Sequence, residues 1–451
     1  MNKSSMPIRT TRWHRLNRLL HSDQVVAHNL IVISGTMGAG ALGVAFQSLV
    51  SHRLQPADYG AVFAMVSLIT LIGLPASAFT LLMARETSRD RASGRQAQSA
   101  ALLGRGSRAL LLAGTVVAVV LLTASPLIAR FIEVPVQLVI ATAAGIPFGL
   151  VLPLLLGEFQ GEERFVAFSL LSVGQAGLKL LSAILLGAIW GPLGIVAGIS
   201  AASAVVYFVA IRLLKRKLSI KPRLPWLRPA AGYLVVVIPS TLALAVLLSA
   251  DVLLVKHFFP IQAAGEYAAV AALGRAIFWG ATGVAVVLFP KVVMRGARGQ
   301  SGLHLVAISL TLVALGGLAG IGLLSFGSRS LLVAFAGPSY VGGAPYLPWY
   351  AVGMILLGAV AVLIATHQSH GKPGFLAVLL PLTIMEPFLV VLFHENLMQV
   401  VLIVDVSMAL VVFGLGALYV IRERADRLSM SLRVAGPPAA ATGMSTRWLN
   451  R

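Results

Sequence analysis

The chain has 451 residues, of which 58% are hydrophobic and only 11% are charged. This composition excludes an ordinary soluble globular protein and indicates an integral membrane protein. The formal net charge of +20 would suit a nucleic-acid-binding protein, but the Lys and Arg residues are not gathered in one basic domain, so nucleic acid is not an expected partner. The absence of cysteine excludes disulfides, thiol nucleophiles and Cys-based metal sites.

Apolar runs long enough to cross a hydrocarbon core of about 30 Å recur along the whole chain. Charged residues, prolines and glycines divide these runs into twelve predicted membrane-spanning helices: 25–50, 59–83, 107–129, 136–158, 165–189, 191–214, 230–255, 266–290, 302–328, 345–366, 373–394 and 397–421. Only "WGPLG" separates the fifth run from the sixth. Pro192 predicts a break there, because proline lacks the N–H that a continuing helix uses.

The Lys and Arg residues predict the orientation of these helices. The basic N-terminus is followed by an apolar run without a small-residue cleavage site, which we interpret as a retained first span. With twelve spans, most Lys and Arg residues lie on the side that holds both termini, and only Arg53, Arg130, Lys256 and Arg329 lie opposite. The positive-inside rule therefore predicts cytoplasmic termini, and the same charges would attract anionic membrane lipids.

The segment "RLLKRKLSIKPRLPWLRP" is the strongest interruption of the apolar pattern and separates six spans from six. We predict a basic cytoplasmic tail at 1–24, a bundle at 25–214, a cytoplasmic linker at 215–229, a second bundle at 230–421 and a disordered cytoplasmic tail at 422–451. An offset of 206 residues brings "SHRLQPADYGAVFAM" near "KHFFPIQAAGEYAAVAAL". The expected fold is an all-α polytopic membrane protein, with two six-helix bundles in a parallel pseudo-repeat around a central cavity.

Two stretches carry a family resemblance. "LVSHRLQPADYGAVFAMVSLITLIGLPASAFTLLMARETSR" and "SADVLLVKHFFPIQAAGEYAAVAALGRAIFWGATGVAVVLFP" resemble matching hairpins of the polysaccharide-transporter family, which contains bacterial oligosaccharide and O-antigen flippases. The resemblance implies alternating-access transport of a polyprenyl-diphosphate-linked oligosaccharide across the bacterial inner membrane, for cell-surface polysaccharide biosynthesis. It also implies a polysaccharide polymerase or ligase as a partner. The superfamily includes cation-coupled multidrug antiporters, which stay an alternative, and lipid II flippases, which typically have fourteen spans.

Two basic residues inside predicted spans are candidates for substrate binding. Lys179 lies near the middle of the fifth span with Gln175 one turn earlier on the same face, which favours a place in a cavity. Arg275 lies in the eighth span, where its guanidinium would bind phosphate oxygens or form an inter-helix salt bridge. Arg85, after the second span, is expected to line a cytoplasmic mouth.

Three acidic residues inside predicted spans are candidates for ion coupling or gating. Asp251, in "LLSADVLLVKHFF", would pair with Lys256, cap a neighbouring helix or bind a proton or cation. Glu386 precedes Pro387, where the helix is expected to bend, and Asp405 lies in the twelfth span. Both acids would bind an ion or neutralise one of the two interior basic residues.

Several kinds of chemistry are absent from the sequence. There is no phosphate-binding G-x-x-x-x-G-K-[ST] loop and no zinc spacing, so we expect no cofactor or metal, and an ion gradient, the membrane potential or product consumption would drive transport. His367 and His370 are predicted to lie in a solvated loop. A membrane-embedded polysaccharide-assembly enzyme is a further alternative, but the longest predicted outer connection, 329–344, is short and consists largely of Gly, Ala and Pro.

Overall fold

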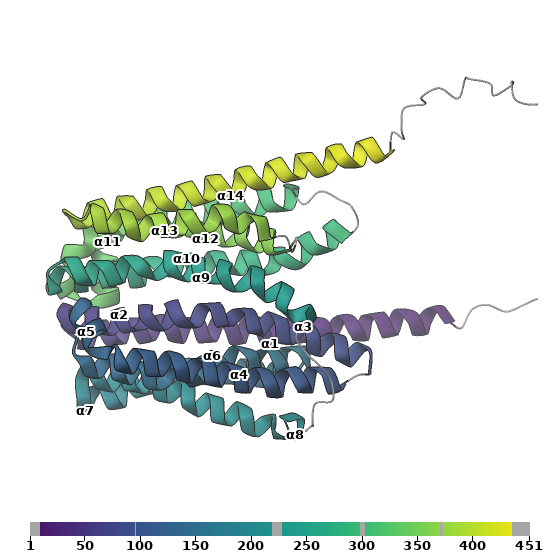
Figure 1. Cartoon of the computed structure of the whole chain (residues 1–451), viewed down its shortest axis with the longest axis horizontal. Helices are drawn as coiled ribbons and strands as arrows, with labels where there is room; N and C mark the ends of the chain where they lie inside the picture. Colours follow the sequence, from purple (N-terminus) through teal and green to yellow (C-terminus); the bar gives the residue numbers. More distant parts are fainter. Residues whose placement is uncertain are drawn as a thin grey trace, which may run out of the picture.

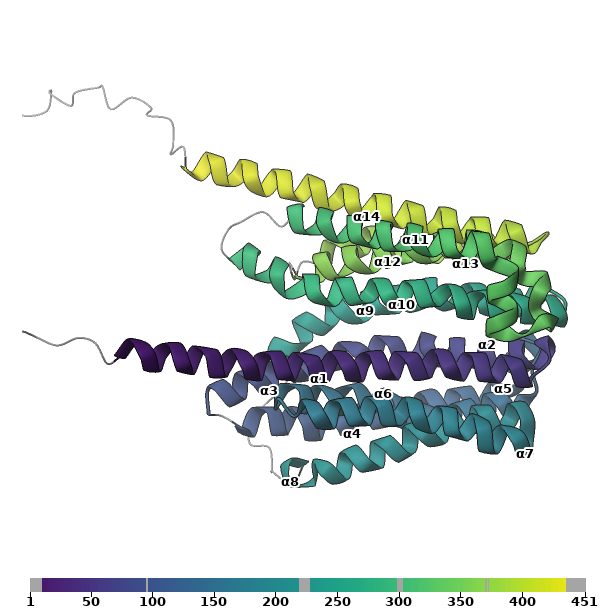
Figure 2. The same ribbon diagram turned by 180° about the vertical axis from the view of Figure 1, so that it is seen from behind.

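The computed structural model describes residues 10–94, 96–218, 228–297, 303–369, 371 and 373–434. Within these residues the chain is a polytopic all-helical protein, and Figure 1 shows two bundles lying side by side with their long axes roughly parallel. Helix α1 begins, and α14 ends, at the same end of the molecule in both views (Figures 1 and 2). We call this the terminal end, and the opposite end the distal end.

The first bundle contains the elements that precede residue 219. They are α1 (Thr10–Arg53), α2 (Pro56–Gly73), η1 (Leu74–Ser77), α3 (Ala78–Ala92), α4 (Gln96–Thr123), α5 (Ser125–Phe131), α6 (Val136–Gly161), α7 (Phe165–Leu213) and the short α8 (Lys215–Leu218). The second bundle contains α9 (Arg228–Phe258), α10 (Ile261–Ala297), α11 (Leu303–Ala336), η2 (Pro338–Tyr346), α12 (Leu347–Ser369), η3 (Pro373–Phe375), α13 (Leu376–Leu392) and α14 (Leu397–Val434).

The predicted break between the fifth and sixth spans is confirmed inside α7. Gly191 has φ +56° and ψ −134°, a backbone conformation that glycine adopts without steric cost, and Pro192 follows it. The two arms on either side, 165–190 and 192–213, fold back on each other. A Cβ at Gly194 would lie 2.0 Å from the carbonyl oxygen of Leu186, and one at Gly198 would lie 2.3 Å from Ser182 Oγ. Glycine is therefore required for this close antiparallel packing.

Ten helical segments of the described chain are long and apolar enough to cross a membrane. One of them is α7, whose two arms count as two spans, and α10 contains the predicted eighth span, so the twelve predicted spans all fall on helices. Several helices extend past their predicted limits: α4 starts at Gln96 instead of 107, and α14 continues to Val434 instead of ending at 421. The predicted tails and linker lie partly outside the described residues.

The two bundles meet along α2, α9 and α10. At one crossing of α2 and α10 the backbones are in direct contact, because a Cβ at Gly265 would lie 1.9 Å from the carbonyl oxygen of Pro56 and one at Gly60 would lie 3.1 Å from the Cα of Gly265. Small residues that allow such close approach are the usual basis of helix packing in membranes, where burial of apolar surface does not drive association.

Candidate functional site

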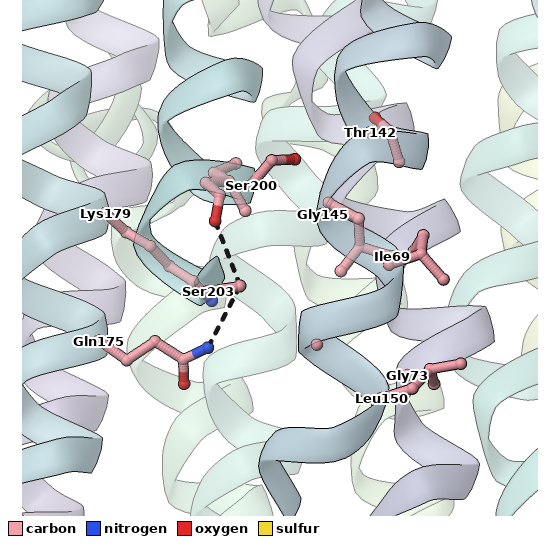
Figure 3. Close-up of a pocket in the computed structure, with 12 residues that line it drawn as sticks. Ile69, Gly73, Thr142, Gly145, Leu150, Gln175, Lys179, Ser200 and Ser203 are labelled. Carbon is pink, nitrogen blue, oxygen red and sulfur yellow. Dashed lines mark hydrogen bonds between the residues drawn. The ribbon is translucent and has the colours of Figure 1, made fainter. Parts of the chain in front are cut away.

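A pocket of about 120 Å³ lies within the first bundle between α2, α6 and both arms of α7 (Figure 3). The apolar part of its wall includes Ile69, Ile146, Leu150 and Ile199, and its glycines are Gly73, Gly145 and Gly149. Five polar side chains complete the lining: Thr142, Gln175, Lys179, Ser200 and Ser203. Both residues that we predicted to line a cavity in this region, Lys179 and Gln175, are therefore at the pocket.

The antiparallel folding of α7 brings the polar lining residues together. Gln175 and Lys179 lie one turn apart on the first arm, and Ser200 and Ser203 lie three residues apart on the second. Gln175 Nε2 donates a hydrogen bond to Ser203 Oγ at 3.4 Å, across the two arms. Without the break at Gly191, the second arm would continue away from the first and these groups would not meet.

The hydroxyl groups of the pocket donate their protons within the protein. Ser200 Oγ donates to the Ala141 carbonyl at 2.6 Å, Ser203 Oγ to the Ile199 carbonyl at 3.2 Å and Thr142 Oγ1 to the Leu138 carbonyl at 2.8 Å. Only the lone pairs of these oxygens remain available to a ligand. The ammonium of Lys179 is therefore the main hydrogen-bond donor that the pocket offers.

Lys179 has no carboxylate partner among the residues that the structure describes. Neither an ion pair nor a hydrogen bond reaches its Nζ among these residues. A positive charge inside a membrane span is costly, so such residues usually face a counter-charge or a polar cavity. Here the polar cavity is present, and the described residues supply no counter-charge, which makes the pocket a candidate binding site for an anionic group.

Arg275 does not line this pocket, because a buried salt bridge in the second bundle engages it. Arg275 Nη2 donates to Asp251 Oδ1 at 3.3 Å, and the hydroxyls of Tyr267 and Tyr350 each donate to Asp251 Oδ2 at 3.0 Å. Of the two readings given by the sequence, the inter-helix salt bridge is the one observed. Pairing with Lys256 was one of three roles that the sequence left open for Asp251, and the residue that pairs with it is Arg275 instead.

Arg275 also connects the second bundle to the first. Its Nη1 donates to Ser67 Oγ of α2 at 3.3 Å, and its guanidinium carbon lies 4.9 Å from the centre of the Phe63 ring on the same helix. A guanidinium over an aromatic face is attracted by the electron density of the ring. One side chain thus joins α9, α10 and α2 at the junction of the two bundles.

Glu386 and Asp405 are buried on α13 and α14 of the second bundle. Neither oxygen of Glu386 has a hydrogen-bond partner among the described residues, although Asp251 and Arg275 are close enough to act on it electrostatically. Asp405 Oδ1 faces the backbone of α12, where a Cβ at Gly353 would lie 2.5 Å from it. Neither acid forms a salt bridge with Lys179 or Arg275 in the described chain.

Two further expectations concern Arg85 and His367. Arg85 is exposed in the middle of α3 and is not part of the pocket. His367 does not lie in a solvated loop: it is buried, its ring stacks on Phe375 at 5.1 Å, and its Nε2 lies 3.1 Å from the Leu415 carbonyl. The helix α12 continues through this residue, which corrects the prediction. His370 lies outside the described residues.

A polar cluster near the terminal end of the first bundle was not predicted from the sequence. Glu158 of α6 is fully buried, accepts a hydrogen bond from Thr87 at 2.7 Å and forms a salt bridge with Lys217 of α8. Lys217 also reaches Glu162 at 3.1 Å. Glu158 occupies the last predicted residue of an apolar run, and this position is the only sequence signal for its burial.

No protein-family model and no curated protein matches the chain. Solved structures do match it. An inward-facing multidrug resistance MATE-family transporter of the MOP superfamily superimposes with a TM-score of 0.72 at 15% identity, over 90% of this chain and 99% of that one. The chain has the fold of this transporter. The lipid II flippase MurJ in an inward closed conformation (TM-score 0.63, 14% identity, 90% and 91% covered) and the eukaryotic MATE transporter AtDTX14 (0.64, 13%, 90% and 99%) are similar in fold as well.

Proposed function

We propose that the protein is a flippase that moves a polyprenyl-diphosphate-linked oligosaccharide across the bacterial inner membrane for the synthesis of cell-surface polysaccharide. The observation that carries the proposal is Lys179, which lies in a polar pocket inside a membrane-spanning helix and has no carboxylate partner in the described part of the chain. An ammonium without a protein counter-charge matches a diphosphate, which is anionic at neutral pH. The fold, which is similar to that of MurJ, is compatible with a lipid-linked substrate.

The arrangement suits a substrate with a polar head and a long apolar tail. The pocket is lined by α2, which also lies at the junction of the bundles, so a head group could reach Lys179 from the space between them. The tail would stay in the surrounding lipid, which avoids the cost of moving apolar surface into water. In this proposal the terminal end faces the cytoplasm, and Arg85, on the helix α3 that leads to this end, attracts the diphosphate before it reaches the pocket.

The buried acids of the second bundle provide a route for ion coupling. One guanidinium, that of Arg275, acts on two carboxylates, Asp251 and Glu386. Burying an uncompensated negative charge is costly, so the second carboxylate would take up a proton or a small cation. Since Arg275 also bonds to Ser67 of α2, the charge of this cluster would influence how the two bundles meet. We propose Asp405 as an additional ion-binding or gating group.

The second candidate function is a cation-coupled multidrug antiporter. It is favoured by the MATE transporters that share the fold and by the carboxylate of Glu386, which has no hydrogen-bond partner among the described residues and would attract cationic compounds. The positive charge of Lys179 in the pocket favours an anionic ligand instead.

A binding experiment on the purified protein separates the two functions. Native mass spectrometry in detergent would compare a polyprenyl-diphosphate trisaccharide with its neutral polyprenol analogue and with a lipophilic cation such as ethidium. The proposal expects retention of the diphosphate lipid, and much weaker retention in Lys179→Gln. Retention of ethidium alone would contradict the flippase and support the antiporter.

A further inference from the structure

Side chains that donate to main-chain carbonyls at helix ends join the two bundles at the distal end. The last carbonyls of a helix have no N–H partner within that helix, so they need a donor from outside it or from water. The helices α1, α5 and α11 end at the distal end of the molecule (Figure 1). At each of these three ends, a donor from the other bundle reaches a carbonyl oxygen.

The first of these contacts is at the end of α1. Leu54 directly follows the last residue of this helix, and its carbonyl oxygen accepts a hydrogen bond from the hydroxyl of Tyr340 at 2.8 Å. Tyr340 belongs to η2 of the second bundle and is only 1% exposed. Its ring lies nearly perpendicular to that of Tyr59 on α2, with 5.6 Å between ring centres. The second bundle therefore caps the end of α1 with a buried tyrosine.

The second contact runs in the opposite direction, from the first bundle to the end of α11. The carbonyl of Phe335, in the last turn of α11, accepts a hydrogen bond from Ser48 Oγ of α1 at 2.7 Å. Ser51 Oγ lies 3.2 Å from the same oxygen, but it lies 2.9 Å from the Ser48 carbonyl within α1. Because a hydroxyl has a single proton to donate, Ser48 is the main donor. The ends of α1 and α11 thus cap each other.

The third contact lies at the α9 edge of the same interface. Phe131 is the last residue of α5, and its carbonyl oxygen lies 2.5 Å from His257 Nδ1 of α9. Since a carbonyl oxygen can only accept, this nitrogen carries the proton and donates it. The rings of the two residues also stack, with 4.0 Å between their centres. All three acceptors are therefore uncharged main-chain oxygens.

We propose that these mutual helix caps form the gate that closes the distal end, with the reciprocal contacts of Tyr340 and Ser48 as its main part. When the bundles separate, water can replace the donors at the same carbonyls, so opening leaves no main-chain group without a partner. Breaking a buried salt bridge would instead leave an uncompensated charge. The caps suit a gate that opens and closes repeatedly. The gate rests on the proposed alternating access and does not depend on the transported molecule.

The absence of native cysteine allows a single introduced thiol to report on opening. Ala264 of α10 is 3% exposed and lies at the crossing with α2, where a Cβ at Gly60 would be 3.6 Å from its carbonyl carbon. Ala264→Cys therefore reports on separation of the bundles. Ala143→Cys, in a buried cluster whose members all belong to the first bundle, reports on general loosening of the fold. The measurement is the rate of reaction with a maleimide in nanodiscs, where both ends of the protein are accessible.

Removal of the cap donors should open the gate. We expect Tyr340→Phe, which removes only the hydroxyl, to raise the labelling rate of Ala264→Cys about fivefold, the effect of losing one hydrogen bond. Ser48→Ala combined with Ser51→Ala should give a similar increase. Joining all three changes should raise the rate further, because the two contacts hold different carbonyls. The labelling rate of Ala143→Cys should stay the same in each of these variants.

Ser125→Ala is the matched control. Ser125 is also a buried serine of the distal end, and it donates to the carbonyl of Leu122 in the last turn of α4 at 2.7 Å, but both residues belong to the first bundle. This change should leave the labelling of Ala264→Cys unaltered. The gate would be overturned by an unchanged Ala264→Cys rate in the joined variant, by an equal increase in Ser125→Ala, or by an equal increase at Ala143→Cys. Each of these results could be obtained even if transport itself were confirmed.

Discussion

Lys179 and Arg275 are the two basic residues that the sequence places inside spans, and the structure gives them different surroundings. Arg275 is neutralised by Asp251 and tied to Ser67, whereas Lys179 faces a polar pocket without a protein counter-charge in the described chain. A basic residue whose charge is already neutralised by a protein carboxylate has a structural role, whereas one without such a partner can bind an anionic ligand. Lys179 is therefore the candidate residue for substrate contact.

Replacement of Lys179 tests this assignment. We expect Lys179→Gln to lower transport of a lipid-linked oligosaccharide by about tenfold or more at unchanged protein level, because a charge-assisted contact to the diphosphate is lost. Lys179→Arg should keep part of the activity. Lys215→Gln, on an exposed residue of α8, is the matched control for loss of a positive charge. Transport at the normal rate in Lys179→Gln would remove the residue from the site.

Arg275 should behave as a structural residue. Arg275→Gln leaves the buried Asp251 with only tyrosine hydroxyls, so we expect the free energy of unfolding to fall by about 3–5 kcal/mol. Adding Asp251→Asn should recover part of this loss, because the uncompensated charge is then removed as well. Unfolding in mixtures of detergent and SDS measures the free energy of unfolding of the single and the double variant. Fully additive losses in the double variant would show that the two side chains do not form an energetic pair.

The sequence predicted some of these residue surroundings and not others. The spacing of Gln175 and Lys179 on one helical face was sufficient to place both at a pocket. The partner of Asp251 could not be predicted, because Lys256 is near it along the chain while Arg275 is brought near only by the packing of α9 on α10. Tyr267, Tyr350 and Ser200 had no distinguishing signal, since each also fits an ordinary apolar span.

At the scale of elements, breaks in the helices position the site. Gly191 and Pro192 reverse the chain inside α7 and bring Ser203 to Gln175. This break could be predicted from the sequence because proline lacks the N–H that a continuing helix uses and glycine adopts positive φ without steric cost. The ends of the helices were less predictable. The third span was predicted to begin at 107 and the twelfth to end at 421, yet α4 already begins at Gln96 and α14 continues to Val434.

The contact between α2 and α10 can be tested with a single methyl group. In Gly265→Ala the new Cβ would lie 1.9 Å from the Pro56 carbonyl oxygen, so the helices must separate. We expect a loss of stability of about 1–3 kcal/mol, typical of overpacking. Gly280→Ala, on the same helix but with no atom within 4 Å of its Cβ, is the control and should be neutral or slightly stabilising. Equal effects at both positions would contradict close packing at Gly265.

At the scale of the whole molecule, the two bundles carry different kinds of polar groups. The first contains a pocket with a lysine that has no carboxylate partner among the described residues, and the second contains a cluster of buried acids neutralised in part by one arginine. Arg275 and the distal contacts link the two. Such a division would allow substrate binding in one bundle and ion binding in the other to act on the same interface. The number of spans and the two-bundle plan followed from the apolar pattern, whereas the pairing of charges across the bundles depended on the three-dimensional packing.

The most direct test of the central claim is the leaflet distribution of a lipid-linked sugar. Purified protein would be reconstituted into liposomes with a polyprenyl-diphosphate trisaccharide in both leaflets, and a membrane-impermeant glycosidase would be added outside. With the wild-type protein we predict cleavage of nearly all the substrate, since lipid from the inner leaflet reaches the outside. With Lys179→Gln, or without protein, cleavage should stop near the outer-leaflet half. Cleavage that stops near half with correctly folded wild-type protein would contradict the flippase.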